Sequence, residues 1–362
     1  MAVRQKGRDK GWSIESSLEE LALLCRTAGA EVVGRLIQQR DRPSPQTYLG
    51  KGKIEELLAL INEHKYTVVV VDDELTPFQQ QNLEELLLIK IIDRTALILD
   101  IFSQRARTKE GQLQVELAQH QYLLPRLAGQ WSHLERLGGG IGTRGPGESQ
   151  LETDRRIIRR KIQRLKDEIG KIRKHRALYQ HQRQRTGIPV VALVGYTNAG
   201  KSTLFNKLCH ADVFVEDKLF ATLDPTTRRI KLPNNKDILL TDTVGFIQKL
   251  PTTLVAAFNA TLEELQSAAM LLHVVDKTHK DADLQRKTVE EVLVQLDLAQ
   301  KPTIVALNKV DRLDESTKNS LDEHGIEVKL KDTVQISAKT GFGIPELMEL
   351  ILRKLADTSS KV

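Results

Sequence analysis

The sequence predicts an α/β protein in three parts: a small N-terminal α/β lobe at 1–102, a long antiparallel α-helical hairpin at 103–186, and a larger α/β domain at 187–362. In the first part, short apolar runs alternate with helical patterns. In the second, two regularly spaced apolar stripes flank a glycine-rich connection. In the third, an apolar run passes directly into a glycine-rich loop that is followed by a helical pattern. The length of 362 residues fits this division.

Composition excludes several protein classes. The hydrophobic fraction of 40 % and the charged fraction of 28 % are typical of a folded globular chain. No stretch approaches the roughly 20 apolar residues of a membrane span, and no apolar segment follows the basic N-terminus as in a secretory signal. Cys25 and Cys209 lie far apart in sequence and suggest neither a disulfide framework nor a metal site. We expect a monomeric, cytoplasmic protein without an integral membrane span.

The lobe is expected to contain βαβ units. Apolar runs predict strands at 31–33, 67–71 and 90–93. Helical patterns predict helices at 54–60 and 78–88. In the second of these helices, Leu83, Leu86 and Leu87 are expected to share one buried face. The basic glycine turn at 50–53 is too short to indicate a phosphate loop and is interpreted as a plain turn before a helix.

Two apolar stripes predict the helical hairpin. The first alternates spacings of four and three residues: Leu113, Leu117, His120, Leu124, Leu127, Trp131 and Leu134. Only His120 interrupts its apolar character, and Pro125 predicts a kink. The second has the same spacing: Ile158, Ile162, Leu165, Ile169 and Ile172. Two such helices joined by one loop, at 138–149, predict an antiparallel pair.

The loop and the second helix have features of an RNA-binding surface. Six of the twelve residues at 138–149 are glycine, so the loop is either a disordered connector or an open tip, to which Arg144 adds a phosphate-seeking charge. Residues 151–186 contain thirteen Lys or Arg against four Asp or Glu, a net charge of +9, whereas the whole chain carries +6. A solvated basic face is the plain interpretation. The concentration of charge beside the tip, from Arg155 onward, favours nucleic-acid binding.

The third part begins with a phosphate-binding motif. An apolar run at 189–194 leads into a match to G-x-x-x-x-G-K-[ST], made of Gly195, Tyr196, Thr197, Asn198, Ala199, Gly200, Lys201 and Ser202. Such glycines let backbone N–H groups surround phosphates at a helix N-terminus. Lys201 is expected to reach the β- and γ-phosphates, and the Ser202 hydroxyl is expected to bind Mg²⁺.

Three further motifs follow, each at the end of a predicted strand. They are Asp242, Thr243, Val244 and Gly245; Asn308, Lys309, Val310 and Asp311; and Ser337, Ala338 and Lys339. Asp242 can hold Mg²⁺ through water, and the Gly245 N–H can contact a γ-phosphate. A carboxylate at Asp311 can accept the N1–H and amino hydrogens of guanine, which adenine lacks at those edges. The order and spacing match the translation-factor-like P-loop GTPases, which predicts binding of GTP and GDP with Mg²⁺.

A first switch segment must lie between Ser202 and Asp242 and supply a threonine to Mg²⁺. Residues 220–227 contain three candidates: Thr222, Thr226 and Thr227. Spacing alone does not choose among them, because the latter two can equally line the strand expected at 228–232.

Two positions depart from the commonest GTPase pattern. Phe246 stands where many such enzymes have a water-orienting Gln, and a phenyl ring cannot orient water by hydrogen bonding. We therefore expect slow hydrolysis that a partner accelerates. Asn198 either offers its side-chain carbonyl to a K⁺ ion beside the phosphates or merely favours the turn.

The chain resembles the HflX-type GTPases of the Obg-HflX group over nearly its whole length. The resemblance rests on runs at 50–52, 93–102, 104–108, 139–156, 195–202, 220–225 and 242–246, of which 139–156 is the most specific. The resemblance implies a ribosome-associated GTPase that binds the large subunit, with the hairpin loop reaching rRNA near the peptidyl-transferase region. Some members split stalled ribosomes under stress. In this family a hydrophobic residue at the position of Phe246 is usual.

The resemblance also selects Thr222 as the Mg²⁺-binding threonine and adds its neighbours to the nucleotide site: Phe220, Ala221, Leu223 and Asp224. One hypothesis is therefore a GTP hydrolase, slow alone and activated on the large subunit, in which Lys201, Thr222 and Gly245 are catalytic. The alternative is an RNA- or ribosome-binding assembly factor that uses GTP mainly as a conformational ligand.

Overall fold

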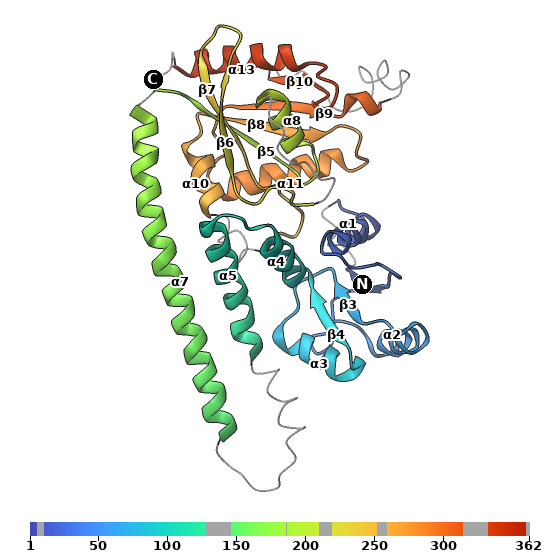
Figure 1. Ribbon diagram of the computed structural model, residues 1–362. Helices are drawn as coiled ribbons and strands as arrows, with labels where there is room; N and C mark the ends of the chain where they lie inside the picture. Colours follow the sequence, from blue (N-terminus) through green and yellow to red (C-terminus); the bar gives the residue numbers. More distant parts are fainter. Residues whose placement is uncertain are drawn as a thin grey trace. The chain divides into compact units, whose positions relative to one another are not determined.

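The computed structural model describes residues 1–5, 11–127, 146–185, 187–209, 219–251, 259–313 and 332–359 (Figure 1). These residues divide into two compact units. The first takes in the described residues of Met1–Gln104, Gln112–Ile172 and Pro251–Ala257. The second takes in those of Arg105–Gly111, Arg173–Leu250 and Phe258–Val362. The helices α5 and α7 each begin in one unit and end in the other.

The N-terminal lobe is built on short parallel strands. They are β1 (Ala2–Gln5), β2 (Ile37–Arg40), β3 (Val68–Val71) and β4 (Lys90–Asp93), and β1 pairs with β2 as β3 pairs with β4. The Asp72 N–H donates to the Met1 carbonyl at 2.9 Å, which joins the two pairs. Parallel neighbours require crossovers, and helices provide them: α1 (Ile14–Thr27), α2 (Lys51–His64), α3 (Pro77–Leu87) and α4 (Arg94–Arg105). The expected α/β lobe is confirmed.

Two details of the lobe differ from expectation. The strand expected at 31–33 is wrong: these residues are irregular, Val33 is 63 % exposed, and Ile37–Arg40 pairs with β1 instead. On α3, Leu83 and Leu87 are buried but Leu86 is 48 % exposed. The buried stripe follows a spacing of four, starting from Gln79, and this turns Leu86 toward solvent.

The helical hairpin consists of α5 (Lys109–Leu123) and α7 (Pro146–Arg185). Leu113 of α5 shares a buried cluster with Leu165 and Ile169 of α7, and Leu117 and Ile172 pack against it. These residues belong to the two expected apolar stripes.

Ion pairs give the direction of the two helices. Glu110 and Glu116 of α5 pair with Arg176 and Lys161 of α7, respectively, so the helices run antiparallel as expected. At Pro125 the α-helical geometry ends, and Leu124–Arg126 form a 3₁₀ turn. Trp131, Leu134 and Arg144 lie outside the described residues.

The second unit contains a six-stranded sheet in the order β10-β9-β8-β5-β7-β6, of which only β6 is antiparallel to its neighbour. The strands are β5 (Val190–Gly195), β6 (Thr226–Lys231), β7 (Asp237–Asp242), β8 (Met270–Asp276), β9 (Thr303–Asn308) and β10 (Thr333–Gln335). The helices are α8 (Lys201–Cys209), α10 (Asn259–Ser267), α11 (Ala282–Gln295) and α13 (Ile344–Ser359), with a 3₁₀ turn at Val310–Arg312.

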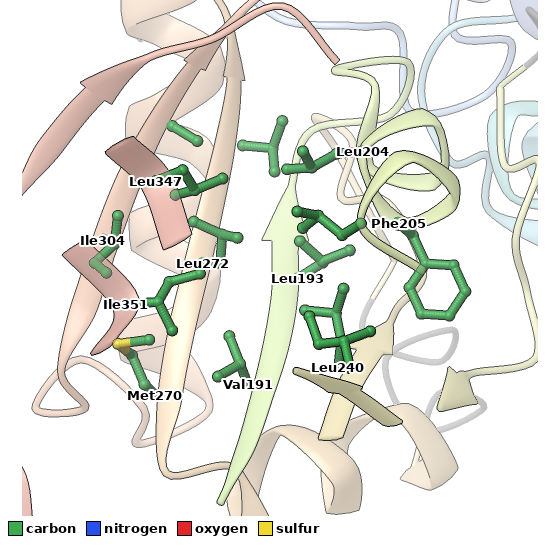
Figure 2. Close-up of a cluster of buried hydrophobic side chains, with 14 of the residues drawn as sticks. Val191, Leu193, Leu204, Phe205, Leu240, Met270, Leu272, Ile304, Leu347 and Ile351 are labelled. Atoms are coloured by element: carbon green, nitrogen blue, oxygen red, sulfur yellow. The ribbon is translucent and has the colours of Figure 1, made fainter. Parts of the chain in front are cut away.

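A buried apolar cluster joins α8 and α13 to one face of this sheet (Figure 2). Leu272 and Ile304 contribute from β8 and β9, and Phe205 and Leu347 contribute from the helices. Residues alternate between the two faces of a strand, so Val275 lies on the opposite face, where it clusters with Ala282 of α11. With both faces covered, the expected α/β fold of a P-loop GTPase is confirmed, and its functional residues lie where β5, β7 and β9 end.

None of the described helices is long and apolar enough to cross a membrane.

Candidate functional site

The loop between β5 and α8 has a backbone that only glycine fits at two positions. Gly195 has a φ of +153°, and a Cβ there would lie 2.3 Å from the Val274 carbonyl oxygen. Gly200 has a φ of +93°, and a Cβ would lie 2.3 Å from the Asn308 side-chain nitrogen. These glycines therefore allow the loop to approach Val274 of β8 and Asn308 of β9 closely.

Lys201 holds its ammonium group within this loop. Its Nζ donates to the carbonyl oxygens of Gly195 at 3.1 Å and Tyr196 at 2.8 Å. The side chain is buried, and this burial lowers the Lys201 pKa to about 8. A phosphate placed beside the ammonium would offset this desolvation, because an opposite charge favours the protonated form.

Three oxygens gather next to the lysine. Ser202 Oγ and Thr222 Oγ1 each donate to Asp242 Oδ2, at 2.8 and 2.9 Å, and lie 2.8 Å from each other. Asp242 Oδ1 is buried and accepts no hydrogen bond from the described residues. Burial raises the pKa of the Asp242 carboxyl. A carboxylate and two hydroxyls at the N-terminus of α8 form the kind of oxygen donor set that suits Mg²⁺, so these residues fit the ion that the motifs predict.

The other two threonines of the switch segment occupy a strand. Thr226 begins β6 and is paired with Asp242 in the register with β7. The Thr227 hydroxyl lies 2.9 Å from that of Thr241 on β7. Geometry thus brings Thr222, and neither of these, to the Ser202 hydroxyl.

The segment after β7 is tied to the phosphate loop through its backbone. The Phe246 N–H donates to the Gly195 carbonyl at 3.1 Å, and the Thr197 N–H donates to the Phe246 carbonyl at 2.8 Å. A Cβ on Gly245 would lie 2.9 Å from both Lys201 Nζ and Thr197 Cα. Gly245 therefore brings its backbone close to the lysine, while the Phe246 side chain is buried.

The residues expected to contact the base lie together at the ends of β9 and β10. Asn308 donates to the Ala199 carbonyl at 2.9 Å and accepts the Ala338 N–H at 2.9 Å, so it joins the phosphate loop to the 337–339 turn. The Ser337 hydroxyl donates to Asp311 Oδ1 at 2.7 Å. These contacts hold an exposed carboxylate, on Asp311, at one end of the site.

Sequence reasoning missed one residue of the site, Asp276, and placed another, Asp224, at the nucleotide although its side chain has other partners. Asp276 ends β8 and pairs with Lys309 at 2.7 Å, and Lys309 also donates to the Asn198 carbonyl at 2.8 Å. The run at 270–275, which is apolar except for His273 and is followed by an Asp, could have indicated Asp276, because an apolar strand also precedes Asp242. Asp224 was expected at the nucleotide, yet its carboxylate accepts hydrogen bonds from Arg107 and Thr108.

A cleft opens at the phosphate loop and the oxygen cluster. It is lined by Thr197, Asn198, Gly200, Lys201, Ser202, Thr203, Phe220, Ala221, Thr222, Thr243 and Gly245. The buried cation, the oxygen cluster and the backbone N–H groups of the loop are suited to a nucleoside triphosphate with its metal ion.

Comparison with known proteins also indicates a GTPase, and the matches span most of the chain. Three family models match in sequence: "GTP-binding GTPase N-terminal" at 15–103, "GTP-binding GTPase Middle Region" at 105–183, and "50S ribosome-binding GTPase" at 190–309. The GTPase HflX of Caldanaerobacter subterraneus subsp. tengcongensis is 52 % identical over 94 % of this chain and 77 % of its own length. The chain belongs to the HflX family of GTPases.

A second HflX protein and a solved structure are also similar to this chain. The GTPase HflX of Escherichia coli is 45 % identical over 94 % of this chain and 79 % of its own length. Among solved structures, the crystal structure of SsGBP in complex with GDP is 25 % identical, covers 99 % of this chain and 98 % of its own, and has a TM-score of 0.51. As an HflX protein, the chain carries a GTPase domain and binds guanine nucleotides.

Proposed function

We propose that this HflX-family chain is a ribosome-associated GTPase that binds the large ribosomal subunit and hydrolyses GTP there, in the rescue or splitting of stalled ribosomes under stress. The GTPase activity in this proposal is supported most directly by the oxygen cluster of Ser202, Thr222 and Asp242 beside the buried Lys201. Binding to the ribosome is supported by the "50S ribosome-binding GTPase" description of the matching family and by the basic surface of α7.

In the hydrolytic site, Lys201 would neutralise the β- and γ-phosphates in place of its present carbonyl partners. The Gly245 N–H would contact the γ-phosphate. Ser202 and Thr222 would hold Mg²⁺ directly and Asp242 would hold it through water. The ion supplies charge that stabilises the phosphoryl group being transferred. Asn308 and Asp311 would select guanine.

The exposed face of α7 supports binding to RNA. Six of its basic side chains are exposed and form no ion pair with another described residue: Arg156, Arg159, Arg160, Lys166, Lys171 and Lys174. Arg156, Arg160, Lys171 and Lys174 lie on the side of the helix opposite the buried Ile162, Leu165 and Ile169, whereas Arg159 and Lys166 border that buried face. A row of unpaired cations at a helical repeat suits the regularly spaced phosphates of a folded RNA. Together with Arg144 and the glycine-rich loop, this face would contact rRNA near the peptidyl-transferase region.

Phe246 supports activation by a partner. Its ring is buried and cannot orient a water molecule, and its backbone is already paired with the phosphate loop. The same observation favours a second candidate, an assembly factor for which GTP is mainly a conformational ligand. Turnover measured with and without large subunits separates the two.

A monovalent cation at Asn198 is part of the proposal. Asn198 has a φ of +61°, its carbonyl accepts from Lys309, and its side chain is exposed next to the cleft. A K⁺ ion held by the side-chain carbonyl would add positive charge near the phosphates. We expect hydrolysis to be faster in KCl than in NaCl at equal ionic strength, and equal rates would exclude the cation.

Cosedimentation with separated subunits tests the ribosomal assignment. In the presence of a non-hydrolysable GTP analogue, we expect the chain to pellet with the large subunit and not with the small one. Replacement of residues 138–147 by a flexible linker of equal length should weaken this binding while nucleotide affinity stays unchanged. Equal pelleting with both subunits, or none with either, would contradict the proposal.

A further inference from the structure

The carboxylate of Asp224 joins the switch segment to the start of α5. Its Oδ2 accepts the backbone N–H groups of Arg107 at 2.8 Å and of Thr108 at 2.9 Å. Its Oδ1 accepts the Thr108 hydroxyl at 2.5 Å. These three hydrogen bonds form the Asp224 clasp, and all its residues belong to the second unit. Charge-assisted bonds of this kind are stronger than bonds between neutral groups.

Helix chemistry explains why a carboxylate sits there. Thr108 precedes the first residue of α5, and its Oγ1 accepts the Gly111 N–H at 3.0 Å, as a capping residue does. The unpaired N–H groups and the dipole of a helix N-terminus favour a negative charge. Gly111 leaves room for it, because a Cβ at this position would lie 2.3 Å from Asp224 Oδ1.

The clasp lies close in sequence to the oxygen cluster. Asp224 follows Thr222 by two residues, which span at most about 7 Å of backbone. The intervening Leu223 is buried. Fixing Asp224 and Leu223 therefore restricts where the Thr222 hydroxyl can lie.

The first turn of α5 is itself held from a second side. Glu110 lies 3.5 Å from Arg176 of α7, whose guanidinium also donates to Glu264 of α10 at 2.8 Å. All three side chains are largely shielded from solvent. The clasp thus joins the switch segment to a braced helix end and not to a free loop.

We infer that Asp224 is a positioning residue, and that its clasp to Arg107 and Thr108 holds Thr222 beside Ser202 and Asp242. The first turn of α5 thereby becomes part of the support of the metal site, and a change at either end is transmitted to the other. This inference rests on the proposed role of Thr222 as a Mg²⁺ ligand.

Two glycine substitutions test the clasp. Gly111→Ala places a methyl group against Asp224, whereas Gly170→Ala in α7 places one where no atom lies within 4 Å. Both replace a helical glycine and favour the helix equally. Only Gly111→Ala is expected to raise the Mg²⁺ concentration for half-maximal GTP hydrolysis, by about tenfold, and to lower kcat. Neither should change the affinity for GDP measured without Mg²⁺.

A conservative pair at Thr108 provides an independent test. Thr108→Val removes the hydroxyl at nearly constant shape and should repeat the Mg²⁺ effect of Gly111→Ala. Thr108→Ser keeps the hydroxyl and should restore wild-type Mg²⁺ dependence. Coupling is reciprocal, so a GTP analogue with Mg²⁺ should slow amide hydrogen exchange at the start of α5 in the wild type and not in Asp224→Ala.

The outcomes separate the inference from the proposed function. If Thr222→Ala raises the Mg²⁺ requirement while Gly111→Ala and Thr108→Val leave it unchanged, Thr222 serves the metal and the clasp does not position it. If Thr222→Ala itself has no effect, the proposed role of Thr222 fails. Faster turnover in Gly111→Ala would show that the clasp restrains the switch instead of positioning it, which also overturns the inference.

Discussion

Replacing Asp311 by Asn is expected to reduce the affinity for GTP by about 100-fold and to create binding of xanthosine triphosphate. The Asp311 carboxylate would accept two hydrogen bonds, from N1–H and the amino group of guanine. An amide offers a donor that opposes the guanine amino group but matches the carbonyl that xanthine has at the same position. Because Ser337 holds one oxygen of this side chain at 2.7 Å, the replacement group should keep its place.

Nucleotide competition measures this effect. GTP and xanthosine triphosphate are titrated against a fluorescent nucleotide for the wild type, Asp311→Asn and a control, Asp283→Asn. Asp283 is exposed in the first turn of α11, and its substitution changes the net charge equally without touching the site. An unchanged GTP affinity in Asp311→Asn would contradict the guanine assignment.

The exposed basic face of α7 gives the second large effect. The triple substitution of Arg156, Arg159 and Arg160 by Gln should weaken binding to the large subunit by about 100-fold at physiological salt. Each phosphate contact that is lost reduces the number of counterions released when the protein binds RNA. The slope of log affinity against log salt concentration should fall by about 2 to 3. All three side chains are exposed and Gln is a good helix former, so the helix should remain folded.

A matched triple substitution isolates position from charge. Lys231, Lys287 and Arg353 are exposed on the second unit, outside the hairpin, and their replacement by Gln removes the same net charge. We expect this control to bind the subunit nearly as well as the wild type. Equal losses in the two triple variants would mean that net charge, and not the α7 face, determines the affinity.

The GTPase domain and the helical hairpin could be predicted from the sequence because each depends on local patterns. The motifs that contain Ser202, Asp242 and Asp311 lie where parallel strands end, and such strand ends meet at one edge of a sheet. The stripe through Leu165 and Ile169 predicted the buried side of α7, because helical periodicity fixes which positions share a face.

Other features depend on contacts that sequence spacing does not encode. Residues 220–227 contain three threonines. The structure distinguishes them, because Thr226 and Thr227 pair with β7 whereas Thr222 contacts Ser202 and Asp242. The hydrogen bond between Asp224 and Thr108 joins residues 116 positions apart in the sequence, and no local pattern at either residue indicates its partner. The strand expected at 31–33 failed because β-branched residues favour a strand only where a neighbour is available, and β1 pairs with 37–40.

GTP turnover by the chain, alone and with purified large ribosomal subunits, tests the central claim most directly. With Phe246 buried and no water-orienting side chain at that position, the chain alone should turn over slowly. Saturating large subunits should raise kcat by at least about tenfold, and small subunits should not. Turnover that large subunits leave unchanged would contradict a ribosome-activated GTPase and favour a factor for which GTP is only a conformational ligand.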